Sequence, residues 1–340
     1  MVIGGGVAGL TAAWELSKFQ VNVELVEKKG SLGGHAIDFC CKATDKCMKC
    51  GACAAEKMLQ NVLESSNINV HLATEVDTIE SKDNFSVQLK SSADEAKATG
   101  TVDADAVIVA NGYTPFDATL KPTYNYGTAK NVITGLELER MIREEGKAVR
   151  PSDNKEANRI AFIQCVGSRD ERLGNLWCSQ VCCPYALRMA KHMKHRQPEA
   201  EISIFYMDIQ NTGRDFTTFY EECKSDLRFV RAIPIDMFPL EGDLIKTRYC
   251  EENKSESIWE EYDLIVLSVG MTPGADNDQL SKLLSVELNV DGFFAPKESL
   301  SLDKGMFAAG AATGPKNIPD SMAQARQAAN EVVNYLTGGK

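Results

Sequence analysis

The chain has 340 residues, a net charge of -11 and a pI near 5.0; it is longer than one ordinary domain, so we expect two domains or one large α/β unit with an insertion. The acidity, with no basic cluster, excludes nucleic acid and an anionic membrane surface as partners. No apolar run approaches the roughly 18 residues of a membrane helix and no signal peptide is recognisable. The eleven cysteines therefore predict a reducing, cytoplasmic setting in which thiols serve metal or redox chemistry.

The first residues predict a dinucleotide-binding unit. A short strand at residues 1–3 runs into residues 4–9, the glycine loop, whose sequence GGGVAG has the G-x-G-x-x-G spacing, and residues 10–19 have helical apolar spacing. A second strand at residues 21–26 ends in Glu27. Such glycines let backbone N–H groups approach a pyrophosphate at the helix N-terminus, and the acid binds a ribose hydroxyl. The first strand is either short in the fold or lacks residues upstream.

A glycine doublet, Gly33-Gly34, follows the acid and favours FAD over NAD, because in two-dinucleotide flavoproteins it lies beside the pyrophosphate and ribityl chain. Next, Cys47, Cys50 and Cys53 have the C-x2-C-x2-C spacing of three ferredoxin ligands, but Lys57 replaces the fourth cysteine. These three cysteines form a candidate second cluster site.

Completing that second site would need Cys40, Cys41 or a ligand from elsewhere. The alternative is a flavin-coupled redox disulfide, since disulfide reductases also place cysteines after the glycine doublet. Their cysteine pair begins sooner after the doublet, so the spacing here does not match.

The rest of the first lobe reads as strands. Apolar patterns predict one strand at 70–73 and 75–76, hairpin strands at 85–89 and 100–103, and a buried parallel strand at 106–110 that ends at Asn111-Gly112. Residues 113–158 are richer in proline, glycine and charge, with one amphipathic helix at 136–144, and are typical of a connection between lobes.

In the second lobe, a strand at 160–163 leads into residues 164–183, the cysteine loop. Cys165, Cys178 and the pair Cys182-Cys183 stand where a second dinucleotide-binding loop would carry its glycines. The C-x12-C-x3-C-C spacing is not the two-plus-two spacing of a zinc ribbon. Four thiolates followed at once by a proline favour an iron–sulfur cluster. The alternative is four buried, reduced cysteines that only pack.

The order of elements after this loop repeats a dinucleotide-binding plan without its glycines. The sequence predicts helices at 185–195 and 216–224 and strands at 202–207, 229–233 and 264–269. His192 and His195 lie on a basic helix and are expected to be solvated.

A final strand and small-residue loop at 305–312 lead to a helix at 322–336, with Ser321 and Gln324 at capping-box spacing. In two-dinucleotide flavoproteins such a helix points its positive end at the flavin.

These motifs together resemble a known family. The stretches GGGVAGL, LGGH, NVITGLELER, AFIQCVGSRDE, CSQVCCPYAL and FAAGAATGPKNIPDS are similar to the A subunit of heterodisulfide reductase over nearly the whole chain. The methanogen protein is larger, with added ferredoxin modules; this chain is most similar to the compact A-type subunits of the heterodisulfide-reductase-like complexes of sulfur oxidisers. The A subunit of the quinone-interacting complex of sulfate reducers is the second choice.

The resemblance implies an α/β fold of two Rossmann-like, thioredoxin-reductase-like lobes, with the FAD domain at 1–118 and 273–340 and an NAD-domain-like lobe at 119–272. It implies bound FAD, a [4Fe-4S] cluster on Cys165, Cys178, Cys182 and Cys183, a homodimer, and partnership with B- and C-type subunits. The usual Asp after the last glycine of the FAD motif is Ala311 here, and the segment after Gly34 carries extra cysteines.

We expect the flavin ring to face residues 313–320, where Lys316 is the only cation. Lys316 is the candidate catalytic residue near the flavin, and the alternative is a solvated loop lysine. The expected FAD-binding residues are Gly4, Gly6, Val7, Ala8, Gly9, Glu27, Lys28, Gly33, Gly34, His35, Val76, Ala110, Asn111, Gly112, Gly310, Ala311, Lys316 and Ile318.

The sequence therefore predicts a flavin and iron–sulfur electron-transfer subunit in sulfur metabolism. A self-sufficient NAD(P)H-dependent disulfide reductase would need a second glycine-rich loop and a correctly spaced cysteine pair, and the chain has neither. A scaffold with purely structural cofactors is the third hypothesis.

Overall fold

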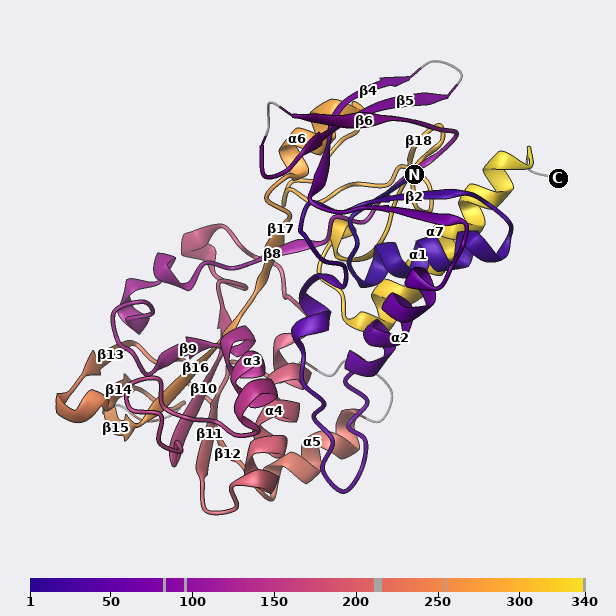
Figure 1. Cartoon of the computed structure of the whole chain (residues 1–340). Helices are drawn as coiled ribbons and strands as arrows, with labels where there is room; N and C mark the ends of the chain where they lie inside the picture. The colour runs from indigo at the N-terminus through magenta and orange to yellow at the C-terminus, as the bar shows by residue number, and fades with distance from the viewer. Residues whose placement is uncertain (82–83, 95–96, 211–215, 253, 255, 339–340) are drawn as a thin grey trace. The chain divides into compact units, whose positions relative to one another are not determined.

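The computed structural model describes residues 1–81, 84–94, 97–210, 216–252, 254 and 256–338 (Figure 1). It divides the chain into two compact units. Unit 1 comprises Met1–Ile37, Gly51–Thr114 and Thr272–Lys340, and unit 2 comprises Asp38–Cys50 and Pro115–Met271. The short paired strands β8 (Tyr113–Pro115) and β17 (Met271–Pro273) carry the chain between them. No helix within the described residues combines the length and apolarity needed to span a membrane.

Unit 1 is built on a six-stranded sheet of order β18-β19-β7-β1-β2-β3, parallel except for the pair β18–β19. Because the carboxyl ends of parallel strands share one edge, the residues after β1, β2, β7 and β19 come together there. The strands are β1 (Val2–Ile3), β2 (Val23–Val26), β3 (Ile68–His71), β7 (Val107–Val109), β18 (Ser301–Asp303) and β19 (Met306–Ala308).

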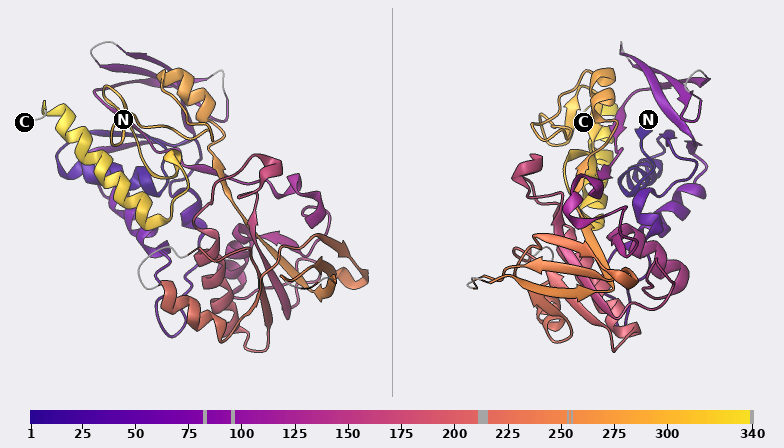
Figure 2. Two further views of the ribbon diagram at one scale, coloured as in Figure 1. Left: turned by 180° about the vertical axis from the view of Figure 1, so that it is seen from behind. Right: turned by 90° about the vertical axis from the view of Figure 1, so that its left-hand side faces the viewer.

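Helices cover one face of this sheet and a second sheet covers the other. On the helical face, α1 (Val7–Lys18) packs against α2 (Ala52–Leu63) and α7 (Ile318–Leu336), and Figures 1 and 2 show the yellow α7 alongside the indigo α1. Alternation in the strands separates the two faces: Val2 and Ile108 pack with the helices, Ile3 and Val107 with the opposite layer. That layer contains β4 (Thr74–Ser81), β5 (Phe85–Ser91), β6 (Ala98–Ala104) and α6 (Asn277–Leu284).

Unit 2 is built on a five-stranded, wholly parallel sheet of order β12-β11-β10-β16-β9. Helices α3 (Gly135–Glu145), α4 (Cys182–Arg196) and α5 (Phe216–Lys224) cover one face. The strands are β9 (Val132–Thr134), β10 (Arg159–Val166), β11 (Glu201–Phe205), β12 (Arg228–Val230) and β16 (Leu264–Val269).

The other face of unit 2 is covered by an antiparallel sheet that the apolar pattern of the sequence did not predict (Figure 1). Its strands are β13 (Asp236–Pro239), β14 (Ile245–Tyr249) and β15 (Ile258–Tyr262). Only one side of each strand is buried, through residues such as Met237, Tyr249 and Tyr262. The alternating charged positions between them hide the strand pattern from a search for continuous apolar runs.

The Asp38–Cys50 segment, expected in the FAD lobe, groups with unit 2. Its Lys42 forms a buried ion pair with Glu139 of α3. Arg188 Nε donates to the Met48 carbonyl at 2.8 Å, and His192 Nδ1 lies 3.1 Å from the Ala43 oxygen. His192 is therefore buried against this segment rather than solvated as expected.

Candidate functional site

The glycine loop has the close contacts that its spacing predicts. Gly4 has φ +102°, and a Cβ there would lie 2.5 Å from the Ala110 oxygen. A Cβ on Gly9 would lie 1.8 Å from the Gly4 oxygen, so the loop and the first turn of α1 can approach only without side chains. Gly6 is the N-cap residue and brings no capping side chain. The N-terminus of α1 thus presents backbone N–H groups and the positive end of the helix dipole, as an anion requires.

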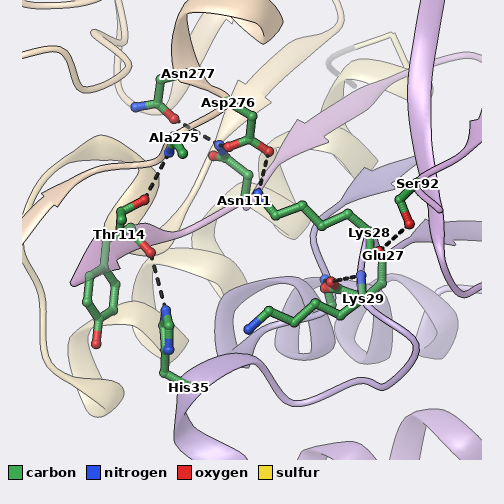
Figure 3. Close-up of polar contacts among 12 residues, drawn as sticks. Glu27, Lys28, Lys29, His35, Ser92, Asn111, Thr114, Ala275, Asp276 and Asn277 are labelled. Atoms are coloured by element: carbon green, nitrogen blue, oxygen red, sulfur yellow. Dashed lines mark hydrogen bonds and ion pairs between the residues drawn. The ribbon is translucent and has the colours of Figure 1, made fainter. Parts of the chain in front are cut away.

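Glu27 closes the same edge from the end of β2. It is buried, and its two carboxylate oxygens accept hydrogen bonds from the backbone N–H of Gly5 at 2.7 Å and of Lys29 at 2.8 Å. Figure 3 shows the Glu27 carboxylate beside the backbone of Lys29. Since each carboxylate oxygen can accept more than one bond, Glu27 keeps capacity for a hydroxyl ligand.

The glycine doublet packs directly on the glycine loop. Gly33 N donates to the Gly5 carbonyl at 2.8 Å, and a Cβ on Gly34 would lie 3.0 Å from Gly6 Cα. The next residue, His35, lies with its ring 4.9 Å from the Tyr113 ring. The structure therefore brings these predicted FAD residues together at one place.

Gly310 completes the floor of this site from the end of β19. Its φ is +72°, and a Cβ would lie 2.5 Å from Ala8 Cβ on α1. Its N–H donates to Gln324 Oε1 at 2.8 Å. The predicted Ser321–Gln324 capping box is therefore wrong: α7 begins at Ile318, with Asn317 as N-cap accepting from Asp320 N. A proline in the first turn allows this earlier start.

Asn111, after β7, is the centre of a polar network that sequence reasoning found only in part. Its Nδ2 donates to Asp276 Oδ1 at 2.7 Å and to Asn277 Oδ1 at 2.8 Å, and Asp276 pairs with Lys28 at 3.0 Å (Figure 3). Asp276 and Asn277 lie far along the chain and match no motif. Within the described part of the chain, the buried Asn111 Oδ1 has no hydrogen-bond partner. A buried acceptor of this kind calls for a donor that a ligand could supply.

The remaining expected FAD residues are placed around these elements. Val76 is buried in β4 and Ala311 follows Gly310, while Ile318 stands against Gly51. Lys316 directs its ammonium into its own loop, donating to Thr313 Oγ1 at 2.8 Å and to the Gly314 carbonyl at 3.2 Å. Burial lowers the pKa of this ammonium below its usual range.

In unit 2, the cysteine loop connects the carboxyl end of β10 to the N-terminus of α4. Cys165 lies at the end of the strand with φ +59°, and Cys182 and Cys183 are the first residues of the helix. Cys165 and Cys178 are half-buried, whereas Cys182 and Cys183 are buried. Burial raises the pKa of Cys183 to about 12 and that of Cys182 well above its usual value; the charges of the other loop cysteines raise both pKa values further.

Ion pairs and backbone bonds hold this loop in place. Arg169 forms a two-bond ion pair with Asp208, at 2.5 and 3.0 Å. Trp177 Nε1 donates to the Met271 carbonyl at 2.9 Å, and Met271 N donates to Ser179 Oγ at 2.8 Å. The four cysteines thus belong to one ordered loop and not to separate parts of the core.

The donor chemistry of the loop fits an iron–sulfur cluster, since one loop carries four thiols and ends at a helix N-terminus, which stabilises thiolates. In the part of the chain that the structure describes, however, no three Cys, His, Asp or Glu side chains stand at metal-binding spacing. A cluster would have to draw the four sulfurs together.

The candidate second site is divided between the units. Cys47 and Cys50 belong to the Asp38–Cys50 segment of unit 2, whereas Cys53 lies in the first turn of α2 in unit 1. Cys40 is buried beside Glu139, and burial with that carboxylate raises its pKa to about 12. The structure therefore does not gather the three predicted ligands within one unit.

Three comparisons place the chain among known proteins. Residues 1–131 match the family model described as pyridine nucleotide-disulphide oxidoreductase. The thioredoxin reductases of Lactococcus lactis (TM-score 0.66, 16% identity, 99% of this chain and 98% of that chain) and T. acidophilum (TM-score 0.64, 15% identity, 100% and 98%) share the fold. This confirms the predicted thioredoxin-reductase-like architecture.

The whole chain is also similar to the iron-sulfur A subunits of two CoB–CoM heterodisulfide reductases, from Methanocaldococcus jannaschii at 34% identity and from Methanopyrus kandleri at 33%. It spans 64% of the length of each relative. The glycine loop, glycine doublet and cysteine loop lie within the matched chain. The whole chain is therefore similar to about two thirds of the length of these heterodisulfide reductase A subunits, and its first 131 residues match the pyridine nucleotide-disulphide oxidoreductase family.

Proposed function

We propose that this chain is the FAD-binding and [4Fe-4S]-binding electron-transfer component of a heterodisulfide-reductase-type complex. The observation that carries the proposal is a pair of sites in one chain: a dinucleotide cradle in unit 1 and, at the corresponding strand-to-helix turn of unit 2, four cysteines instead of glycines. When bound, the flavin couples two-electron to one-electron chemistry, and the cluster passes single electrons.

Unit 1 supplies the groups that hold FAD. The α1 N-terminus receives the pyrophosphate, Glu27 accepts from a ribose hydroxyl, and the orphaned Asn111 Oδ1 accepts from a donor on the cofactor. Lys316 provides a positive charge in the loop before α7, where it favours the anionic reduced flavin. Its half-buried position strengthens that electrostatic effect.

Unit 2 supplies the electron partner of the flavin. Cys165, Cys178, Cys182 and Cys183 ligate one cluster, and the α4 N-terminus stabilises their thiolates. Cys47, Cys50 and Cys53 hold a more labile cluster if they hold one, because no fourth local ligand stands beside them in the sequence. A pyridine dinucleotide is disfavoured here, because the loop carries Gln164, Val166 and Arg169 where the phosphates would need glycines.

Electrons then enter and leave through other proteins. The relatives are themselves named as A subunits of heterodisulfide reductases, which supports B- and C-type subunits as the partners. The sequence resemblance supports a complex of sulfur oxidation as the setting, and the quinone-interacting complex is the second candidate. A homodimer is the expected assembly of this chain.

Cofactor analysis of the anaerobically purified protein tests this proposal. We expect one FAD per chain with iron and acid-labile sulfide, and Cys182→Ser should lower iron to whatever the N-terminal cysteines hold. Cys250→Ser is the matched control, since Cys250 is exposed and stands outside both cysteine groups. A wild-type protein without flavin, or iron unchanged in Cys182→Ser, would refute the assignment.

A further inference from the structure

Two polar side chains of the cysteine loop are buried without partners. Gln164 and Ser168 are each 1% exposed, and in the described residues the Gln164 amide oxygen and nitrogen and the Ser168 hydroxyl make no hydrogen bond. Native proteins pair nearly all such atoms, because an unpaired buried polar group loses its hydration without compensation. Their neighbour Ser179 is paired normally, with Met271 N.

Both side chains belong to the cysteine loop. Gln164 directly precedes Cys165 in β10, and Phe162, two residues earlier, packs in the core under α4. The first turn of α4 is formed by Cys182 and Cys183. The pairing of β10 with β16 becomes irregular between Ile163 and Val166, where the strand enters the loop.

Ser168 follows Cys165 by three residues in the loop. Its N–H donates to the Cys165 carbonyl at 3.3 Å. A Cβ built on Gly270 would lie 3.2 Å from Ser168 Oγ and 2.8 Å from Ser179 Oγ, so the two hydroxyls are neighbours. Ser179 directly follows Cys178, so the unpaired Ser168 hydroxyl neighbours a residue adjacent to Cys178, while the Ser168 backbone contacts Cys165.

We infer that Gln164 and Ser168 are positioning residues that donate N–H···S and O–H···S hydrogen bonds to the sulfurs of the cysteine-loop cluster and raise its reduction potential. This rests on the proposed function, because the sulfur acceptors are those of the bound cluster. Hydrogen bonds to cluster sulfurs stabilise the more negative, reduced state. Both donors are fully buried, so solvent does not screen the effect.

The test is a redox titration of the intact protein by electron paramagnetic resonance, with iron and sulfide measured on the same samples. Gln164→Met and Ser168→Ala remove the donors at similar volume, and Ser168→Thr keeps the hydroxyl. Thr247→Val is the matched control. The Thr247 hydroxyl is also buried and has no hydrogen-bond partner among the described residues, but it lies on β14, in the antiparallel sheet on the other face of unit 2.

We expect Gln164→Met and Ser168→Ala to retain iron and each to weaken cluster reduction about tenfold, a shift of about 59 mV for one electron. Ser168→Thr and Thr247→Val should match the wild type. If Gln164→Met loses iron, the reduction potentials of Ser168→Ala and Ser168→Thr still test the inference. If Gln164→Met and Ser168→Ala keep their iron and have the cluster potential of the wild type, the inference is wrong but the proposed function stands. A wild-type protein without cluster iron would overturn the proposed function as well.

Discussion

The buried ion pair between Lys42 and Glu139 anchors the Asp38–Cys50 segment to unit 2, and breaking it should be costly. The Lys42 side chain is 2% exposed and that of Glu139 is 0% exposed. Glu139 Oε2 also accepts from Cys40 N at 3.0 Å, and the Lys42 ammonium lies over the rings of Phe39 and Tyr185, at 5.2 and 5.5 Å. Lys42→Met therefore leaves a buried carboxylate without its cation.

Removing one partner of a buried pair costs about 3–5 kcal/mol, whereas replacing both is often close to neutral. We expect Lys42→Met to lower the free energy of unfolding of unit 2 by about that amount. The double variant Lys42→Met/Glu139→Gln should recover most of it, because glutamine keeps an acceptor for Cys40 N without the charge.

Hydrogen exchange of the α3 and α4 amides in increasing urea measures this free energy for unit 2 by itself. Lys147→Met is the control, since the Lys147–Glu156 pair is exposed and should contribute little. The reasoning fails if Lys42→Met is no more destabilising than Lys147→Met, or if the double variant is as unstable as the single one.

Three single substitutions probe the buried histidine, the glycine cradle and the loop lysine. Burial lowers the pKa of His192, so as the pH falls the unfolded state, in which this pKa is about 6.5, takes up a proton before the folded state does. Unit 2 should therefore lose stability as the pH falls from about 6.5 through the lower pKa of the folded state. Urea titrations at about pH 7.5 and 5.5 should show a smaller loss of stability in His192→Gln than in the wild type. Gly310→Ala should sharply reduce bound flavin, because its Cβ would lie 2.5 Å from Ala8 Cβ, whereas Gly146→Ala, with nearly the same φ but open space, should retain it; equal flavin content in the two variants would contradict the cradle. Lys316→Ala should lower the flavin potential by removing a cation from the loop before α7, and a potential equal to that of the wild type would show that the lysine does not act on the flavin.

Much of unit 1 could be predicted because its elements follow one local motif. The turn from β1 into α1 requires glycines at Gly4 and Gly9, and the sequence shows them in register with Glu27. The Asn111 network was only half visible, because Asp276 and Asn277 reach it from a distant part of the chain. Such pairings depend on topology, which local patterns do not encode.

Unit 2 was harder to predict where tertiary contacts separate residues that are close together in the sequence. Cys47, Cys50 and Cys53 read as one ligand run, yet Lys42 and Arg188 hold the first two against unit 2 while Cys53 begins a helix of unit 1. The buried spacing of Ala55, Met58 and Val62 identifies that helix, α2, which the cysteine pattern obscures.

Stopped-flow mixing of the oxidised protein with excess NADH tests the central claim most directly, with dithionite as the reference reductant. If the cysteine loop has replaced the nicotinamide site, dithionite should bleach the flavin while NADH reduces it far more slowly than an enzyme turns over. Flavin reduction by NADH at rates on the order of 10 per second would contradict the account and favour a self-sufficient disulfide reductase.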